Sequence, residues 1–223
     1  MEKIIYILLL IILENDFYND ITTIYNPTSY DFLVNKNNKL TSDYIPKDLE
    51  VIDIKYSCKD KYLRHESRIN FEKLAKQAKE EGFNIIAVST YRSYEYQEKL
   101  YNNYVLDKGF YYADMASARA GHSEHQTGLA VDVANSSLDY DNFENTKEFT
   151  WMKENCYKYG FILRYPKGKF HITGFKYEPW HYRYVGTEIA TYIYKNNLTL
   201  EEYKLLNKKS EYLYSYFNII KCL

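Results

Sequence analysis

Apolar residues recur at helical spacing between residues 66 and 81. Phe71, Leu74, Ala75 and Ala78 occupy the positions i, i+3, i+4 and i+7, which lie on one face of a helix. Gly82 follows, and glycine commonly ends a helix because it adopts positive φ without strain. The pattern predicts a helix that buries its apolar face.

The same spacing predicts further helices, and local residues indicate some of their ends. Ser93 can cap a helix that runs to about Lys108, where Gly109 would end it. Thr199 and Glu202 have the spacing of a capping box for the last helix. The remaining predicted helices are a short one over residues 113–119, a longer one over residues 145–159, and one that Thr187 would cap.

Short apolar runs between the helices predict strands. In the run from Leu129 to Val133 the larger side chains share one face, and Ala130 and Asp132 share the other. Asp132 is therefore expected to face a surface of small residues that could form the floor of a cleft. The other predicted strands are Ile85–Val88, Phe161–Leu163, residues 170–173, and residues 31–34 within an extended lead-in (14–48) that wraps around the domain without forming its core.

Length and composition limit the possible functions. The 223 residues show no internal repeat and no Gly/Ser-rich linker, so we predict one domain (34–207) between an N-terminal segment (1–33) and a tail (208–223). The net charge of −1 gives no electrostatic reason to expect nucleic-acid binding. The three cysteines include no C-x-x-C pair, so neither a cysteine zinc site nor a disulfide framework is predicted, and Cys156 is expected to be a buried thiol.

An apolar run covers residues 4–13 near the start of the chain. It is too short for a membrane-spanning helix, which needs about 20 residues. Its length fits the apolar region of an export signal, with Lys3 as the positive residue, but Glu2 lies beside it and no A-x-A cleavage site follows. Two interpretations remain. The run is an export signal or short anchor of a cell-wall or membrane-associated protein, or it is a buried N-terminal helix.

The candidate chemistry lies in two separated groups of residues. His125 precedes Asp132 by one short turn and a strand, and Glu178 precedes His181 by three residues, with Pro179 between them. A catalytic zinc site typically has three protein ligands and leaves one position for water. His125, Asp132 and His181 are therefore predicted to bind zinc, and Glu178 to act as the general base.

Arg92 follows a predicted strand on a turn that leads into the next helix. Such turns often carry functional side chains, and a guanidinium there could hold a developing oxyanion or a terminal carboxylate. The alternative is an ordinary solvated arginine. Among the other histidines, His171 is expected to pack within its predicted strand, and His65 and His122 are given no chemical role.

The two groups resemble the signature of a known family. Ser123-x-His125-x-x-Gly128-x-Ala130-x-Asp132, followed by Glu178-Pro179-Trp180-His181, is similar to the motifs of the VanY-type D-alanyl-D-alanine carboxypeptidases. These zinc peptidases are related to lysostaphin-like enzymes and to the hedgehog fold. Tyr91-Arg92-Ser93 with Gln97, and Tyr182-Arg183-Tyr184-Val185-Gly186, are also similar, so the resemblance extends over roughly residues 34–200.

The resemblance implies a fold, a reaction and roles for individual residues. The fold would be α+β, with a small antiparallel sheet flanked by helices. His125, Asp132 and His181 would bind Zn²⁺, with Glu178 as the catalytic base and Arg92 assisting the carbonyl oxygen. Ser123 and Gln97 match positions near the substrate. The expected reaction is removal of the C-terminal D-Ala from peptidoglycan stem peptides, as a D,D-carboxypeptidase.

Four alternatives keep the same residues but change the function. The enzyme could be an L,D-carboxypeptidase or a D-Ala-D-Ala dipeptidase, because stereochemical choice depends on pocket walls that the motifs do not include. The fold could also serve as a non-catalytic cell-wall-binding module, although such a module would need neither Glu178 nor Arg92. A purely structural role for the group would leave it without zinc, at a cost for burying its charges.

Overall fold

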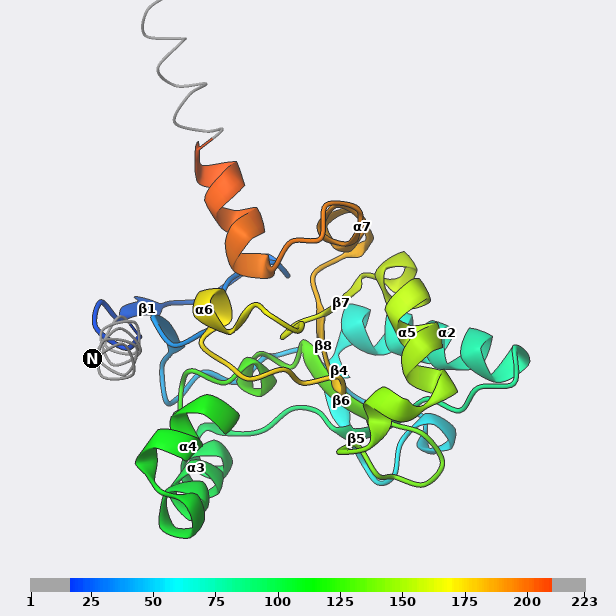
Figure 1. Cartoon of the computed structure of the whole chain (residues 1–223), viewed down its shortest axis with the longest axis horizontal. Coiled ribbons are helices and arrows are strands. Elements are labelled where there is room, and N and C mark those ends of the chain that lie inside the picture. Colours follow the sequence, from blue (N-terminus) through cyan, green and yellow to red (C-terminus); the bar gives the residue numbers. More distant parts are fainter. Residues whose placement is uncertain (1–16, 210–223) are drawn as a thin grey trace, which may run out of the picture.

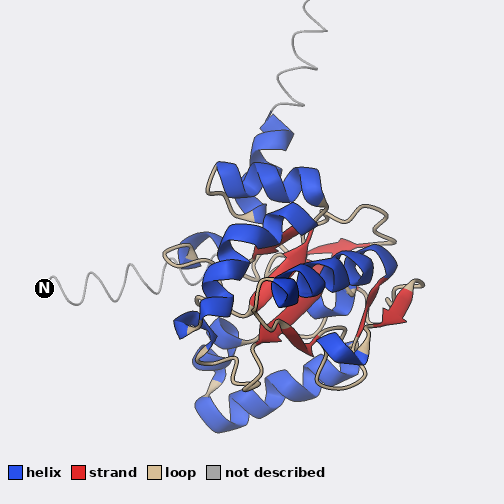
Figure 2. Cartoon of the chain, turned by 90° about the vertical axis from the view of Figure 1, so that its right-hand side faces the viewer, coloured by secondary structure: helices blue, strands red, loops and turns tan. Residues whose placement is uncertain are grey.

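A four-stranded antiparallel sheet lies at the centre of the computed structural model, which describes residues 17–209 (Figure 1). Its order is β5-β6-β8-β7, formed by Ile86–Ser89, Ala130–Ala134, His181–Tyr184 and Phe161–Leu163. All three pairings are antiparallel. Helices surround the sheet in Figure 2, which confirms the expected α+β architecture.

Helices α2 (His65–Glu80) and α5 (Lys147–Asn155) bury their apolar sides against one face of the sheet, on the right of Figure 1. Leu74 of α2 and Met152 of α5 share this core with Val131 of β6. The helical spacing in the sequence is thus explained by burial, since each fully buried large apolar side chain contributes about 1.5–3 kcal/mol. A 3-10 turn, η4 (Cys156–Tyr159), continues α5 and buries Cys156 as expected.

The opposite face of the sheet carries the polar side chains of β6 and β8. Helices α3 (Tyr94–Lys108) and α4 (Phe110–Ala116) stand to this side, at the lower left of Figure 1. Ser93 caps α3, as predicted, by accepting a hydrogen bond from the Tyr96 amide, and Gly109 ends it. Helix α7 (Thr187–Lys195) follows β8, and residues 200–209 form the last described helix. Thr199 and Glu202 make the predicted capping box at its start.

The lead-in contributes more than predicted. It forms the parallel pair β1 (Thr22–Ile24) and β2 (Asn38–Leu40), and β3 (Leu49–Val51) pairs with β4 (Tyr62–Arg64), with the 3-10 turn η1 (Ile54–Tyr56) between them. Residues 31–34 form no strand. Phe32, Val34 and Leu40 nevertheless belong to the main core, so the expectation that this segment only wraps the domain was wrong.

Three predicted elements need correction. Residues 170–173 form the short helix α6 (Phe170–Thr173) instead of a strand, because no strand lies beside them and Gly174, at φ 75°, ends the turn. His171 is exposed on this helix and is not packed in a sheet. The helix predicted over 113–119 begins earlier, at Phe110, and ends at Ala116. Gly186 rather than Thr187 occupies the cap of α7.

The prediction for residues 4–13, and that for the tail apart from residues 208 and 209, concern parts of the chain outside the described residues. Within residues 17–209, no helix combines the length and the apolar character needed to cross a membrane. The proposed domain limits stay a prediction.

Candidate active site

The sheet register brings Asp132 and His181 together. Asp132 on β6 is the direct partner of His181 on β8, and both side chains lie on the face opposite α2 and α5. The Nδ1 atom of His181 is 3.0 Å from Oδ1 of Asp132. Directly opposite residues on antiparallel strands have Cβ atoms about 4.5–5.5 Å apart. The sheet itself therefore holds these two side chains within reach of one ion.

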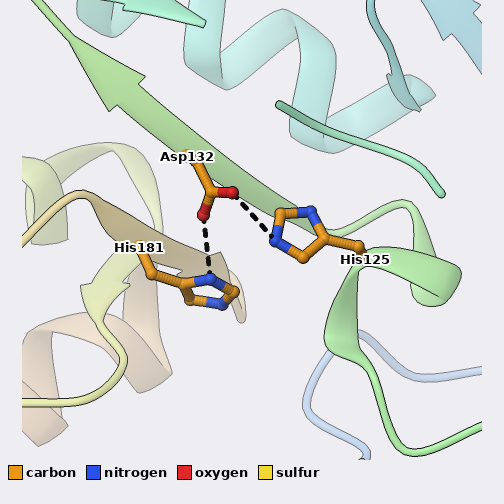
Figure 3. Close-up of side chains that lie close together, drawn as sticks. All are labelled: His125, Asp132 and His181. Carbon is orange, nitrogen blue, oxygen red and sulfur yellow. Dashed lines mark ion pairs between the residues drawn. The ribbon is translucent and has the colours of Figure 1, made fainter. Parts of the chain in front are cut away.

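His125 reaches the same carboxylate from a different element. It lies on the 3-10 turn η2 (Glu124–Thr127), which Gly128 ends in the left-handed conformation before the chain enters β6. The Nδ1 atom of His125 lies 2.7 Å from the Thr90 carbonyl oxygen, which can accept its proton. That bond directs Nε2 toward Asp132, 3.2 Å from Oδ2 (Figure 3). The free nitrogen of the ring thus faces the cleft.

These three side chains fit a metal ion. One ligand atom from each of His125, Asp132 and His181 lies within 4.8 Å of the others, and all three residues are buried. Asp132 Oδ1 is buried and has no hydrogen-bond partner apart from its ion-pair contact with His181 Nδ1, which is costly for a carboxylate oxygen unless a cation compensates it. Two imidazoles and one carboxylate are also a donor set that suits zinc.

The two rings differ in basicity. Burial, followed by the charge of Arg92, lowers the pKa of His125 to about 4, so this ring is neutral at pH 7. Burial alone would lower the pKa of His181 too, but hydrogen bonds to Asp132 and Glu124 outweigh it and raise the pKa to about 9. A metal ion at this site would therefore compete with a proton on His181.

Glu178 lies beside the candidate metal ligands His125, Asp132 and His181 and is not one of them. Its Oε2 atom is 3.7 Å from Nδ1 of His181, and the residue is 8% exposed. Burial raises the pKa of Glu178 to about 7; the charge of His181 opposes the rise and that of Asp132 adds to it. A carboxyl group with a pKa near neutrality suits proton transfer in both directions.

Arg92 is held over the same carboxylate. Its Nη2 atom is 2.7 Å from Asp132 Oδ2, and Nε and Nη2 both donate to the Ser89 hydroxyl, at 2.9 and 2.6 Å. Ser89 pairs with Asp132 across β5 and β6. The side chain is 19% exposed, which excludes the alternative of an ordinary solvated arginine. Its positive charge faces the cleft wall where a substrate oxygen could bind.

A cleft of about 430 Å³ opens in front of these residues, between the sheet and helices α3 and α4. Ser123 and Gln97 both line it, as the resemblance implied. The Gln97 amide nitrogen donates to the Ala118 carbonyl and the Ser117 hydroxyl, which leaves Oε1 buried without a protein partner. Aromatic rings form much of the remaining wall: Tyr96, Tyr104, Tyr112, Tyr140, Tyr165, Phe175 and Trp180.

The other histidines stay outside this arrangement. His65 pairs with Glu50 at the surface, and His122 is buried with its Nδ1 atom 2.8 Å from the Asn35 carbonyl oxygen. His171 is exposed on α6. None of them joins the group of metal-ligating side chains found among residues 17–209.

Sequence reasoning missed Glu124, which is fully buried beneath His181. Its Oε1 atom accepts hydrogen bonds from Arg164 Nε and Arg183 Nη1, at 2.7 and 2.8 Å. Burial would raise its pKa, but the two guanidinium groups outweigh burial and hold the pKa below its usual range. No local pattern marks Glu124, since its partners lie 40 and 59 positions away.

Comparison with known proteins places the chain in a family. The family model described as VanY, D-alanyl-D-alanine carboxypeptidase, matches residues 60–187. The chain belongs to the VanY family. It is also 44% identical over 204 residues to YodJ of Bacillus subtilis (strain 168), covering 86% of this chain and 75% of YodJ.

Two solved peptidase structures resemble this one. The LD-carboxypeptidase LdcB superposes with a TM-score of 0.77 at 44% identity, over 83% of this chain and 90% of LdcB. The D,D-pentapeptidase VanY of a VanB-type vancomycin-resistance cassette, solved in complex with Zn(II), gives a TM-score of 0.69 at 36% identity. That match covers 78% of this chain and 98% of the other. These likenesses confirm the expected zinc-peptidase fold and an enzyme of the carboxypeptidase class.

Proposed function

We propose that this VanY-family enzyme is a zinc carboxypeptidase that removes the C-terminal D-Ala from peptidoglycan stem peptides. The observation that carries the proposal is the convergence of His125, Asp132 and His181 at the floor of a cleft, with Glu178 beside them. A zinc carboxypeptidase needs both the metal ligands and a general base, whereas a module that only binds its ligand needs no carboxyl group of raised pKa.

His125, Asp132 and His181 would hold the zinc ion. When bound, zinc lowers the pKa of a water molecule toward about 7 and polarises a carbonyl group. The structure of the D,D-pentapeptidase VanY with Zn(II) supports zinc as the metal here. The buried Oδ1 atom of Asp132 supports a cation independently, because its close polar neighbour is His181 Nδ1, another candidate ligand atom.

Glu178 would move the proton. Its carboxylate accepts the proton of the attacking water and then delivers it to the leaving amine of D-Ala. Burial raises the pKa of Glu178 to about 7, so neither the uptake nor the release of the proton is strongly unfavourable at neutral pH. Arg92 would stabilise negative charge on the substrate, either on the scissile carbonyl oxygen or on the terminal carboxylate.

Ser123 and Gln97 would contact the substrate at the cleft wall. Gln97 donates two hydrogen bonds through its amide nitrogen, so the group left to accept a hydrogen bond is its buried carbonyl oxygen. Both residues would orient the peptide and not take part in bond breaking.

The D,D-activity is the first candidate, because the matching family model is that of D-alanyl-D-alanine carboxypeptidases. A second candidate is L,D-activity, in which D-Ala is removed from a tetrapeptide stem. The likeness to LdcB favours it, with a higher identity and TM-score than the likeness to VanY. Either activity would act on the cell wall, and so outside the cytoplasmic membrane.

Mass spectrometry of products separates these activities. The protein is incubated with synthetic pentapeptide and tetrapeptide stems and with free D-Ala-D-Ala, each with and without a chelator. D,D-activity shortens the pentapeptide by one residue, and L,D-activity shortens the tetrapeptide. Cleavage of the free dipeptide alone would identify a dipeptidase. If none of the substrates gives a product whose formation the chelator prevents, the proposal is refuted.

A further inference from the structure

His181 lies between two buried carboxylates, one at each nitrogen of its ring. Asp132 faces Nδ1 at 3.0 Å, and Glu124 faces Nε2 at 3.3 Å. Nδ1 faces Asp132 in the candidate metal-binding group, whereas Nε2 faces Glu124, which borders the same cleft but is only 1% exposed. Nδ1 is therefore the ring nitrogen that is directed at the candidate metal-binding group.

Glu124 is itself immobilised by two arginines that are fully buried. Arg164 and Arg183 both donate to its Oε1 atom, which leaves Oε2 for His181. Arg164 makes two further hydrogen bonds to Glu201 of the last described helix, at 2.8 and 2.7 Å. Its guanidinium thus ties Glu124 to a segment far along the chain.

Arg183 is fixed as firmly from the other side. Its Nη2 atom donates to the carbonyl oxygens of Tyr30 and Phe32 in the lead-in, both at 2.9 Å, and its Nε atom donates to the Tyr184 carbonyl. The carboxylate of Glu124 therefore cannot rotate without breaking bonds to buried guanidinium groups. Unpaired charges at this depth are strongly destabilising.

We infer that Glu124 is a positioning residue that holds the His181 ring with its proton on Nε2 and its lone pair on Nδ1 toward the metal. A carboxylate behind a metal-bound imidazole fixes the tautomer and orientation of the ring and makes the ligand atom more basic. The inference rests on the proposed zinc site. It adds a residue that neither touches the substrate nor binds the ion. Arg164 and Arg183, which both bind its Oε1 atom, then serve to place Glu124.

The opposing possibility is that Glu124 only neutralises the two buried arginines. Glu201 provides the matched control, because it is also a glutamate bound to Arg164 but does not contact His181. Glu124→Gln and Glu201→Gln each remove one negative charge from the same guanidinium. Only Glu124→Gln changes the partner of the His181 ring.

The test compares the zinc affinity of the two variants with that of the wild-type protein, by competition with a chromogenic chelator. Circular dichroism first establishes that each variant is folded. Glu124→Gln is expected to bind zinc about 10- to 100-fold more weakly than the wild-type protein, and Glu201→Gln is expected to match the wild type. A folded Glu124→Gln that binds zinc as tightly as Glu201→Gln would overturn the inference.

A second measurement uses the wild-type protein, and so does not depend on whether Glu124→Gln folds. Long-range proton–nitrogen NMR of the zinc-loaded protein identifies the protonated nitrogen of each histidine ring. For His181 we expect a proton on Nε2, and a proton on Nδ1 would overturn the inference. Neither readout requires peptide turnover. Failure of the wild-type protein to bind zinc would refute the proposed function as well, whereas the two contrary results above would refute only the role of Glu124.

Discussion

Asp132 and His181 face each other directly across two antiparallel strands, with Oδ1 and Nδ1 3.0 Å apart. Their proximity is therefore a property of the register of β6 against β8. A slip of one residue would turn either side chain to the opposite face of the sheet. Two of the three proposed metal ligands therefore lie on paired strands of the central sheet, and the third, His125, comes from a turn.

Replacement of Asp132 should abolish stabilisation of the protein by zinc. A metal that binds only the folded state raises the melting temperature. Asp132→Asn keeps the shape but loses the ligand charge, so zinc should bind about 100-fold more weakly or worse. Thermal unfolding with and without one equivalent of zinc measures this. Asp60→Asn, at an exposed position, should respond as the wild type does. An equal zinc-induced rise in Asp132→Asn would contradict the assignment.

Replacement of Arg92 by lysine should reduce turnover without removing the metal. Arg92 spans Ser89 and Asp132 with its forked guanidinium, which a single ammonium group cannot reproduce. Loss of a preorganised hydrogen-bond donor at a developing oxyanion typically lowers kcat about 10²- to 10³-fold. Steady-state kinetics on stem peptides, with zinc content measured in parallel, tests this. Arg68→Lys on α2 serves as the control; full activity in Arg92→Lys would exclude a catalytic role.

Gly128→Ala should destabilise the fold more than Gly82→Ala. Both glycines have positive φ, 67° and 88°, so alanine is strained at either position. Only at Gly128 would the new Cβ collide, at 2.8 Å from a Leu49 methyl carbon and 3.0 Å from Arg64 Cγ. We expect a loss of about 1 kcal/mol for Gly82→Ala and about 2–4 kcal/mol for Gly128→Ala in urea unfolding. Equal losses would show that the collision relaxes freely.

The buried thiol of Cys156 should make the fold sensitive to alkaline pH. Burial raises the pKa of Cys156 from 9.0 to about 12. Between these values the unfolded chain loses the thiol proton and the folded chain keeps it, so this contribution is complete below pH 9 and is lost as the pH rises toward 12. The slope is at most about 1.4 kcal/mol per pH unit.

Urea unfolding of the wild type and Cys156→Ala at several pH values isolates this effect, because the two proteins differ in one titratable group. The stability advantage of the wild type over the variant should shrink above about pH 9. A constant difference across the alkaline range would mean that the thiol ionises as readily in the folded protein as in the unfolded chain.

The parts of the fold that follow a local period could be predicted from the sequence. The apolar face of α2 and the alternation that turns Asp132 away from Val131 are both set by neighbouring residues. The strand predicted for residues 170–173 was wrong, because β-branched and aromatic residues favour a strand only where a partner strand exists. Strands of three residues, such as β1 and β2, carry too little pattern to be detected.

The candidate ligands could be proposed from the sequence because they lie in two short motifs, residues 123–132 and 178–181, in which the chemical residues have a recognisable spacing. Glu124 could not, although it lies next to His125. A charged residue is ordinarily expected at the surface. The burial of Glu124 is explained by its ion pairs with Arg164 and Arg183, which are distant in the sequence. Such pairings depend on tertiary structure, since they join segments with no common local period.

The most direct test of the whole account is Glu178→Gln, assayed for zinc content and for cleavage of a pentapeptide stem in the same preparation. The amide cannot take a proton from water, so turnover should fall about 10²- to 10⁴-fold while one zinc ion per chain is retained. Glu80→Gln, on the exposed side of α2, should leave both quantities unchanged. A zinc-loaded Glu178→Gln that still releases D-Ala at the wild-type rate would contradict the proposed mechanism.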